Sequence, residues 1–126
     1  MLTAVHAFSG LGVTDIAAAR SFYADKLGLA VGEDMGGLTL HLPGGTDLFV
    51  YESPAFAPAG YTVLNFEVPD IDAAVRELAD AGVELERYAG LPHDESGVVR
   101  GRSAGQGPDI AWFRDPAGNI LAILQP

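Results

Sequence analysis

The chain has 126 residues, of which 48% are apolar, and its 17 acidic and 7 basic residues leave a formal net charge of −10. This length and composition suit one compact domain, or two small modules that share a core. The negative charge argues against nucleic acid and against an anionic membrane surface as partners.

Cysteine is absent, which fits a reducing compartment. The first residues lack the basic and apolar stretches of a secretion signal, and no apolar run reaches the roughly 18 residues that a membrane span needs. We therefore expect a cytoplasmic protein without a membrane partner.

The first half of the chain is predicted to contain one strand, one helix and three further strands. Apolar residues at helical spacing between Ile16 and Lys26 indicate the helix, with Thr14 or Asp15 as its cap and Gly28 as the glycine after its end. Short apolar runs separated by glycine and proline predict the strands. These strands are expected at residues 4–9, 30–33, 38–42 and 48–52, with a connector at 53–60.

The second half repeats this order and adds a hairpin at its end. Asp70 is the expected cap of a helix that Gly82 ends. A turn at residues 115–119 joins the two strands of the hairpin. Residues 89–108 form a segment long enough to be either a functional lid or disordered, and we treat it as a candidate lid. The other expected elements are a strand at 61–68, a helix at 71–81 and strands at 83–87, 110–113 and 120–124.

An internal duplication explains this order. Two passages share identical residues at a constant offset of 55 positions, all at cap or core positions of a strand–helix unit. The matches pair Val13, Asp15, Ile16, Ala18, Ala19, Ala24 and Asp25 with Val68, Asp70, Ile71, Ala73, Ala74, Ala79 and Asp80. The chain is thus predicted to hold two βαβββ modules, at about 1–55 and 61–126.

Two stretches carry a resemblance to a known family: Ala-Arg-Ser-Phe-Tyr-Ala-Asp-Lys-Leu-Gly-Leu at residues 19–29, and Trp-Phe-Arg-Asp-Pro-Ala-Gly-Asn-Ile-Leu at 112–121. Together with the duplication, they resemble the vicinal oxygen chelate superfamily. It includes glyoxalase I, extradiol dioxygenases, methylmalonyl-CoA epimerase, fosfomycin resistance enzymes and bleomycin resistance proteins. The resemblance implies one α+β domain over residues 1–126, with an open curved sheet around a cavity, helices packed outside, and a homodimer.

Side chains that alternate along each strand of such a fold face either the helices or the cavity. A tight turn at Gly44-Gly45 would pair His41 with Leu48, and we use this register to assign faces. The expected ligand-binding residues are His6, Phe8, Thr39, His41, Val50, Glu52, Val63, Asn65, Glu67, Trp112 and Ala122.

Enzymes of this superfamily hold one divalent metal through His, Gln or Glu side chains on four strands, and the metal polarises the substrate or activates dioxygen. The resemblance places the corresponding positions here at Phe8, Val50, Val63 and Ala122. None of these side chains can bind a metal, so we expect no metal and no cofactor. A displaced site would have to draw on His6, His41, Glu52, Glu67 and His93.

We therefore expect a protein that binds a small molecule without a metal, as bleomycin resistance proteins do, and that is not an enzyme. Phe8, Tyr51 and Trp112 would supply aromatic walls, and Glu52 or Glu67 would pair with a cation. The alternative is a metal-dependent lyase, isomerase or dioxygenase with displaced ligands. A third possibility is a regulatory or assembly domain without a small-molecule ligand.

Overall fold

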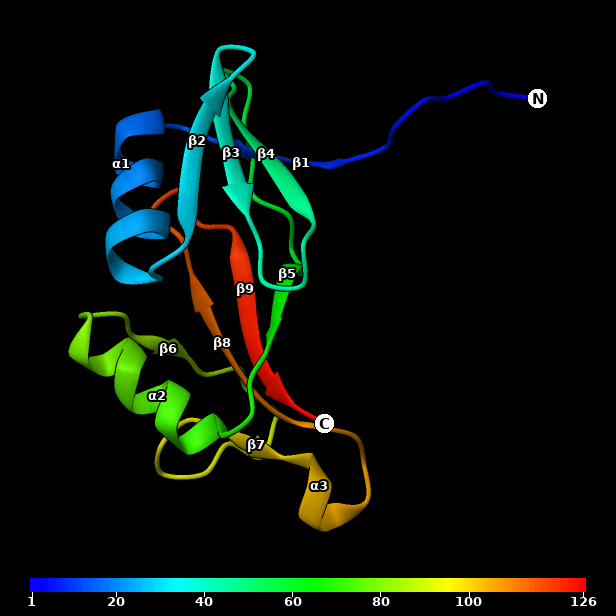
Figure 1. Ribbon diagram of the computed structural model, residues 1–126. Helices are drawn as coiled ribbons and strands as arrows, with labels where there is room; N and C mark the ends of the chain where they lie inside the picture. Colours follow the sequence, from blue (N-terminus) through cyan, green and yellow to red (C-terminus); the bar gives the residue numbers. More distant parts are fainter. The chain divides into compact units, whose positions relative to one another are not determined.

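The computed structural model describes residues 1–126 and contains two compact units, Met1–Ala57 and Pro58–Pro126 (Figure 1). Each unit has its own sheet and a capped helix, and neither sheet closes on itself. The predicted α+β class, built from two tandem modules, is confirmed. None of the helices is both long and apolar enough to cross a lipid bilayer.

The first unit is a four-stranded sheet with a helix on one face. Its elements are β1 (Ser9–Val13), α1 (Ile16–Ser21), the π-helical turn η1 (Phe22–Lys26), β2 (Ala30–Asp34), β3 (Gly37–His41) and β4 (Asp47–Glu52). The strand order is β1-β4-β3-β2, with β1 parallel to β4 and the other neighbours antiparallel. The α1–η1 helix covers the predicted range and packs against β3 and β4.

The first strand starts later than predicted. We expected it at residues 4–9, whereas β1 begins at Ser9 and includes both Gly10 and Gly12. A Cβ atom on Gly12 would lie 3.0 Å from Cδ2 of Phe56, and one on Gly10 would lie 3.5 Å from Cε1 of Tyr51. These glycines therefore leave room for aromatic rings instead of breaking the strand. Residues 1–8 precede the sheet as an exposed segment (Figure 1).

The predicted register between β3 and β4 is wrong by one residue. His41 lies opposite Asp47, not Leu48, and Leu40 lies opposite Leu48. The turn between the strands holds three residues instead of two, because Leu42 N–H donates to the carbonyl of Thr46 at 2.9 Å. Two glycines at φ +94° make this turn possible.

This one-residue shift reverses the predicted faces of β4. Leu48 and Val50 now lie on the same side as Leu38 and Leu40, toward the helix. The buried core of the unit comprises Leu11, Val13, Ala19, Phe22, Tyr23, Leu38, Leu40, Leu48 and Val50.

The second unit has a sheet of five strands. Its elements are β5 (Thr62–Glu67), α2 (Ile71–Asp80), β6 (Leu85–Glu86), β7 (Val99–Arg100), α3 (Gly101–Ala104), β8 (Asp109–Arg114) and β9 (Ile120–Gln125). The order is β5-β9-β8-β6, with β7 also paired to β8 and β5 parallel to β9. The candidate lid thus contains β7 and α3, which its glycine-rich sequence did not indicate.

Both units begin their helix in the same way. The carboxylate of Asp15 accepts from Ala17 N at 3.0 Å, and that of Asp70 accepts from Asp72 N at 3.0 Å. The last residue of the closing strand accepts from the first helical N–H in each unit. Glu52 does so for α1 at 3.2 Å, and Gln125 does so for α2 at 3.0 Å. This shared pattern agrees with the duplication inferred from the sequence.

The predicted hairpin is confirmed, and its turn is held by one buried carboxylate. Asp115 Oδ1 accepts from the backbone N–H groups of Ala117 at 3.0 Å and Asn119 at 2.9 Å. Its Oδ2 accepts from the side-chain amide of Asn119 at 2.9 Å. Gly118, at φ +91°, supplies the left-handed residue that the turn requires.

Replacing this carboxylate should lower the stability of the folded chain. Asp115→Ala leaves buried N–H groups without an acceptor, so we expect the free energy of unfolding to fall by about 1–3 kcal/mol. Urea denaturation followed by circular dichroism measures the change. Asp80→Ala, at the exposed end of α2, is the matched control and should shift stability by less than about 0.5 kcal/mol. Equal effects of both substitutions would contradict this role for Asp115.

Candidate functional site

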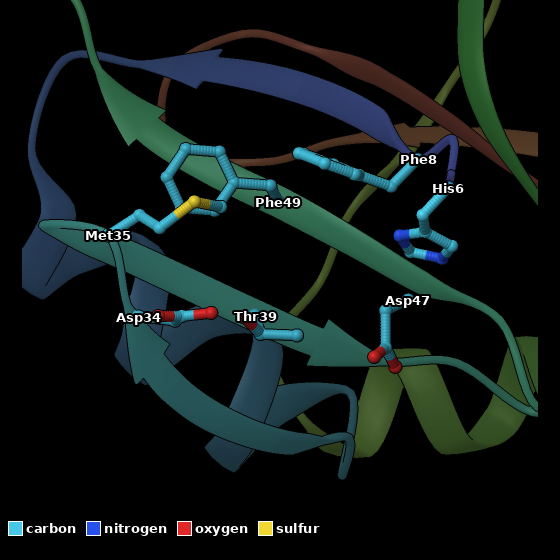
Figure 2. Close-up of a pocket in the computed structure, with 7 residues that line it drawn as sticks. All are labelled: His6, Phe8, Asp34, Met35, Thr39, Asp47 and Phe49. Carbon is cyan, nitrogen blue, oxygen red and sulfur yellow. The ribbon is translucent and has the colours of Figure 1, made fainter. Parts of the chain in front are cut away.

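A hollow of about 170 Å³ lies on the face of the first sheet that points away from α1 (Figure 2). We call it the aromatic hollow, and it is lined by His6, Phe8, Asp34, Met35, Thr39, Asp47 and Phe49. The segment before β1, the β2–β3 hairpin and β4 therefore all contribute to it.

Aromatic rings form a continuous row along this face. The rings of His6 and Phe8 stack with centroids 5.9 Å apart, and Phe8 meets Phe49 edge-on at 6.3 Å. Phe49 in turn stacks on Tyr51 at 6.0 Å. Phe8 is 53% exposed, so the row is open to a ligand instead of being filled as a core.

The charges of the aromatic hollow are all negative apart from histidine. Figure 2 shows His6 and Asp47 at one end of the hollow and Asp34 and Met35 at the other. No lysine or arginine lines it. The Asp47 carboxylate lies 2.8 Å from Nδ1 of His41. The lining of the hollow therefore carries two carboxylates and no lysine or arginine to balance them.

On the second unit, an aromatic cluster lies on the sheet face opposite α2. Gln125 points to α2, so alternation along β9 places Ala122, and Trp112 opposite it, on the other face. Tyr88 and His93 meet the Trp112 ring edge-on at 5.5 and 6.0 Å. Trp112 Nε1 donates to Oγ1 of Thr62 at 3.1 Å. We call Tyr88, His93 and Trp112 the Trp112 cluster.

Asp94 and Arg100 order the segment that borders this cluster. Asp94 Oδ1 accepts from Ser96 and from the backbone N–H of Val98, and its Oδ2 accepts from Nε of Arg100 at 2.8 Å. Arg100 also pairs with Asp72 of α2 at 2.6 Å. Although burial opposes it, hydrogen bonds from Ser96, Arg100 and Val98 hold the pKa of Asp94 well below its usual value.

A family model described as the Glyoxalase/Bleomycin resistance protein/Dioxygenase superfamily matches residues 4–123. The chain belongs to this superfamily. A search of curated proteins found no match.

Solved structures of the superfamily fold resemble the chain along its whole length. TnmS3, an antibiotic binding protein from Streptomyces sp. CB03234, is 22% identical, with a TM-score of 0.65 and 99% of both chains covered. A glyoxalase family protein from Bacillus anthracis is 19% identical, with a TM-score of 0.66 over 99% of this chain and 98% of its own. UcmS2 is 20% identical, with a TM-score of 0.70 over 98% of both chains.

The residues at the metal positions of the superfamily do not fit a metal in this chain. The pairing of β1 with β4 and of β5 with β9 shows that the equivalent of Ala122 is Phe49, not Val50. The corrected set is Phe8, Phe49, Val63 and Ala122, and none of these side chains carries a donor atom. Nor does any group of three or more His, Asp or Glu side chains gather where it could hold a metal.

Two residues of the displaced metal site are already engaged in other contacts. Glu52 accepts from the first N–H of α1, and both ring nitrogens of His93 bind backbone groups. His6 and His41 belong to the first unit, whereas Glu67 lies on β5 of the second.

Several predicted ligand-binding residues do share a surface. His6, Phe8 and Thr39 line the aromatic hollow, and His41 contacts its Asp47. On the second unit, Asn65 and Trp112 lie on either side of Ala122. Glu67 is exposed at the end of β5. The register of β5 shifts between Thr62 and Leu64, so alternation does not assign a face to Val63.

Val50 and Glu52 were wrongly assigned to the binding face. Val50 is 0% exposed in the core against α1, and Glu52 is engaged at the start of that helix. Both errors follow from the register between β3 and β4, since a shift by one residue turns every side chain to the opposite face.

Four residues of the aromatic hollow were missed: Asp34, Met35, Asp47 and Phe49. A three-residue turn, which the Pro43-Gly44-Gly45 sequence also permits, would have revealed Asp47 and Phe49. The β2–β3 turn gave no such signal, because it is formed by Met35 and Gly36 at φ +48° and +79° instead of by two glycines.

Asp94 should make the stability of the chain depend on acid pH. Folding lowers the pKa of Asp94, so the charged carboxylate stabilises the folded chain fully at any pH above the pKa that Asp94 has in the unfolded chain. This stabilisation is lost as the pH falls below about 4. Asp94→Asn should therefore lower the unfolding free energy at pH 7 by about 1.5 kcal/mol, a modest value because the side chain is partly exposed. Urea denaturation from pH 7 to 3 should show a flatter decline for this variant than for the wild type. A parallel decline for the two proteins would contradict the assignment.

Proposed function

We propose that this protein binds and sequesters a small molecule that carries a planar ring and a positive charge, and that it does so without a metal and without transforming it. The observation that carries this proposal is the aromatic hollow, in which partly exposed aromatic rings and two carboxylates line the same space.

The rings favour a planar partner. Phe8 meets Phe49 edge-on and is 53% exposed, so part of its ring is accessible to a planar group. A cation over a ring face is attracted by the ring quadrupole. Asp34 and Asp47 add direct charge attraction, and the excess of acidic residues in the whole chain acts in the same direction.

The size of the hollow limits what enters it. Sites that enclose a whole drug-sized molecule measure roughly 300–1,000 Å³. The aromatic hollow, at about 170 Å³, holds one ring system or one charged arm. The remainder of a larger ligand would extend beyond the hollow, where Tyr51 continues the aromatic row.

Binding without chemistry also fits the side chains at the metal positions of the superfamily. A reaction of the superfamily type needs donor atoms at these positions to hold a metal, and the corrected set is entirely apolar. TnmS3, an antibiotic binding protein of similar fold, is consistent with the binding of a small molecule by this fold.

We further propose that the protein is a cytoplasmic homodimer. Met1, Leu2 and Val5 are apolar and exposed in the segment before β1, next to the exposed Phe8. A second copy would cover this surface, because apolar side chains so exposed favour association. Light scattering should give twice the mass of one chain, and a monomer at micromolar concentration would contradict the dimer.

Titration with matched probes tests the proposed ligand class. We expect ethidium and metal-free bleomycin to bind, and the anionic 8-anilinonaphthalene-1-sulfonate to bind more weakly, as measured by calorimetry. Phe49→Ala should weaken ethidium binding roughly tenfold, a loss of about 1.4 kcal/mol. Asp34→Asn/Asp47→Asn should abolish the preference for cations. Tyr61→Ala, an exposed aromatic residue of the second unit, is the control and should bind as the wild type does.

Two results would overturn the proposal. Equal affinity for cationic and anionic probes, unchanged in the double variant, would remove the role of the carboxylates. One metal ion per chain in protein purified without chelator, lost in His6→Ala/His41→Ala, would instead indicate the metal-dependent alternative. A thermal-shift series with nickel, zinc, manganese and iron provides an independent check of the second result.

A further inference from the structure

His93 is held by two backbone groups that together fix its protonation. Its Nε2 lies 2.9 Å from the backbone N of Tyr88, and its Nδ1 lies 2.8 Å from the carbonyl oxygen of Gly97. A backbone N–H can only donate, so Nε2 must be the unprotonated acceptor. A carbonyl can only accept, so Nδ1 must carry the proton. The ring is therefore neutral and in the Nδ1–H tautomer.

We infer that His93 is a proton-sensitive pin, which holds residues 88–93 against Trp112 when it is neutral and releases them when it is protonated. An imidazolium has a donor on both nitrogens and no acceptor. Protonation would therefore set Nε2–H against the N–H of Tyr88 and leave that N–H without its partner. Histidine is the side chain that ordinarily changes charge between pH 5 and 8.

The pin closes a short loop whose aromatic rings belong to the Trp112 cluster. His93 also bridges to Val99, and its N–H donates to the carbonyl of Leu91 at 3.0 Å. The rings of Tyr88 and His93 meet edge-on or tilted with each other and with Trp112, at centroid distances of 5.5–6.3 Å. Losing the bond between Tyr88 and His93 would thus free two of the three rings in the cluster.

The closed form carries a cost that favours opening. The hydroxyl of Tyr88 is buried and has no hydrogen-bond partner. A buried donor without an acceptor destabilises the state that buries it, and opening would return this hydroxyl to water. The buried Tyr88 hydroxyl thus already destabilises the closed loop. Losing the hydrogen bond between Tyr88 N–H and His93 would destabilise it further.

Other charged side chains lie on and around the loop. They are Glu86, Arg87, Asp94, Glu95, Arg100 and Arg114. The guanidinium groups stay protonated. Asp94, hydrogen-bonded to Ser96, Arg100 and Val98, has a lowered pKa, and burial raises the pKa of Tyr88, so neither changes charge near neutral pH. Arg87 binds the carbonyls of Asp94 and Glu95, which keeps the far side of the loop in place.

Trp112 reports directly on the pin, because it is the only tryptophan of the chain. Between pH 8 and 5, we expect its quenching by acrylamide in the full-length protein to rise about twofold, reversibly and with the uptake of one proton. His93→Gln keeps an acceptor for the Tyr88 N–H but cannot titrate, so its quenching should stay flat. His6→Gln/His41→Gln is the matched control and should keep the transition of the wild type.

A measurement on the wild type tests the pin even if the variant does not fold. Long-range proton–nitrogen NMR correlations at pH 8 should show His93 protonated at Nδ1 and bare at Nε2. The opposite tautomer would overturn the inference. So would a quenching transition that persists unchanged in His93→Gln, because the proton would then act at another residue.

Discussion

The hydrogen-bond register between β3 and β4 is the constraint on which the first unit depends. Pairing His41 with Asp47 places Leu38, Leu40, Leu48 and Val50 against the helix, where they form the core. The same register sends Thr39, Asp47 and Phe49 to the other face, where they line the aromatic hollow. The core and the aromatic hollow thus lie on opposite faces of the same sheet. Shifting the register of β4 by one residue would turn Asp47 and Phe49 toward the core, and Leu48 and Val50 toward the hollow.

The second unit begins its helix as the first unit does, but it carries a different side chain at the position of Phe49. Asp70 and Gln125 start its helix as Asp15 and Glu52 start that of the first unit. The position that Phe49 occupies in β4 is Ala122 in β9, buried between Trp112 and Asn65. Phe49 adds an aromatic ring to the row on the first sheet. Ala122 is small and lies directly opposite Trp112 on the second sheet. The duplicated fold therefore presents two chemically different faces.

Polar groups away from these two faces stabilise the fold. Cap carboxylates, the Asp115 turn and the Arg100 network all stabilise local structure, and none of them needs the positions where a metal would bind. The ligand positions are free to change because the fold does not rest on them. In this chain they hold apolar side chains, which favour stacking and burial over coordination.

Local sequence was enough to predict the helices of residues 16–26 and 71–80, their aspartate caps, the final hairpin and the duplication. Capping, helical spacing and turn chemistry act between residues close in the chain. The sequence also singled out His6, Phe8 and Thr39, which line the aromatic hollow. Only the tertiary structure decided that β1 begins at Ser9, that Phe49 and not Val50 faces the hollow, and that Asp34 and Asp47 flank it. Strand pairing and contacts between distant segments set these features. A turn that is longer by one residue reverses the faces that alternation predicts for the strand after it.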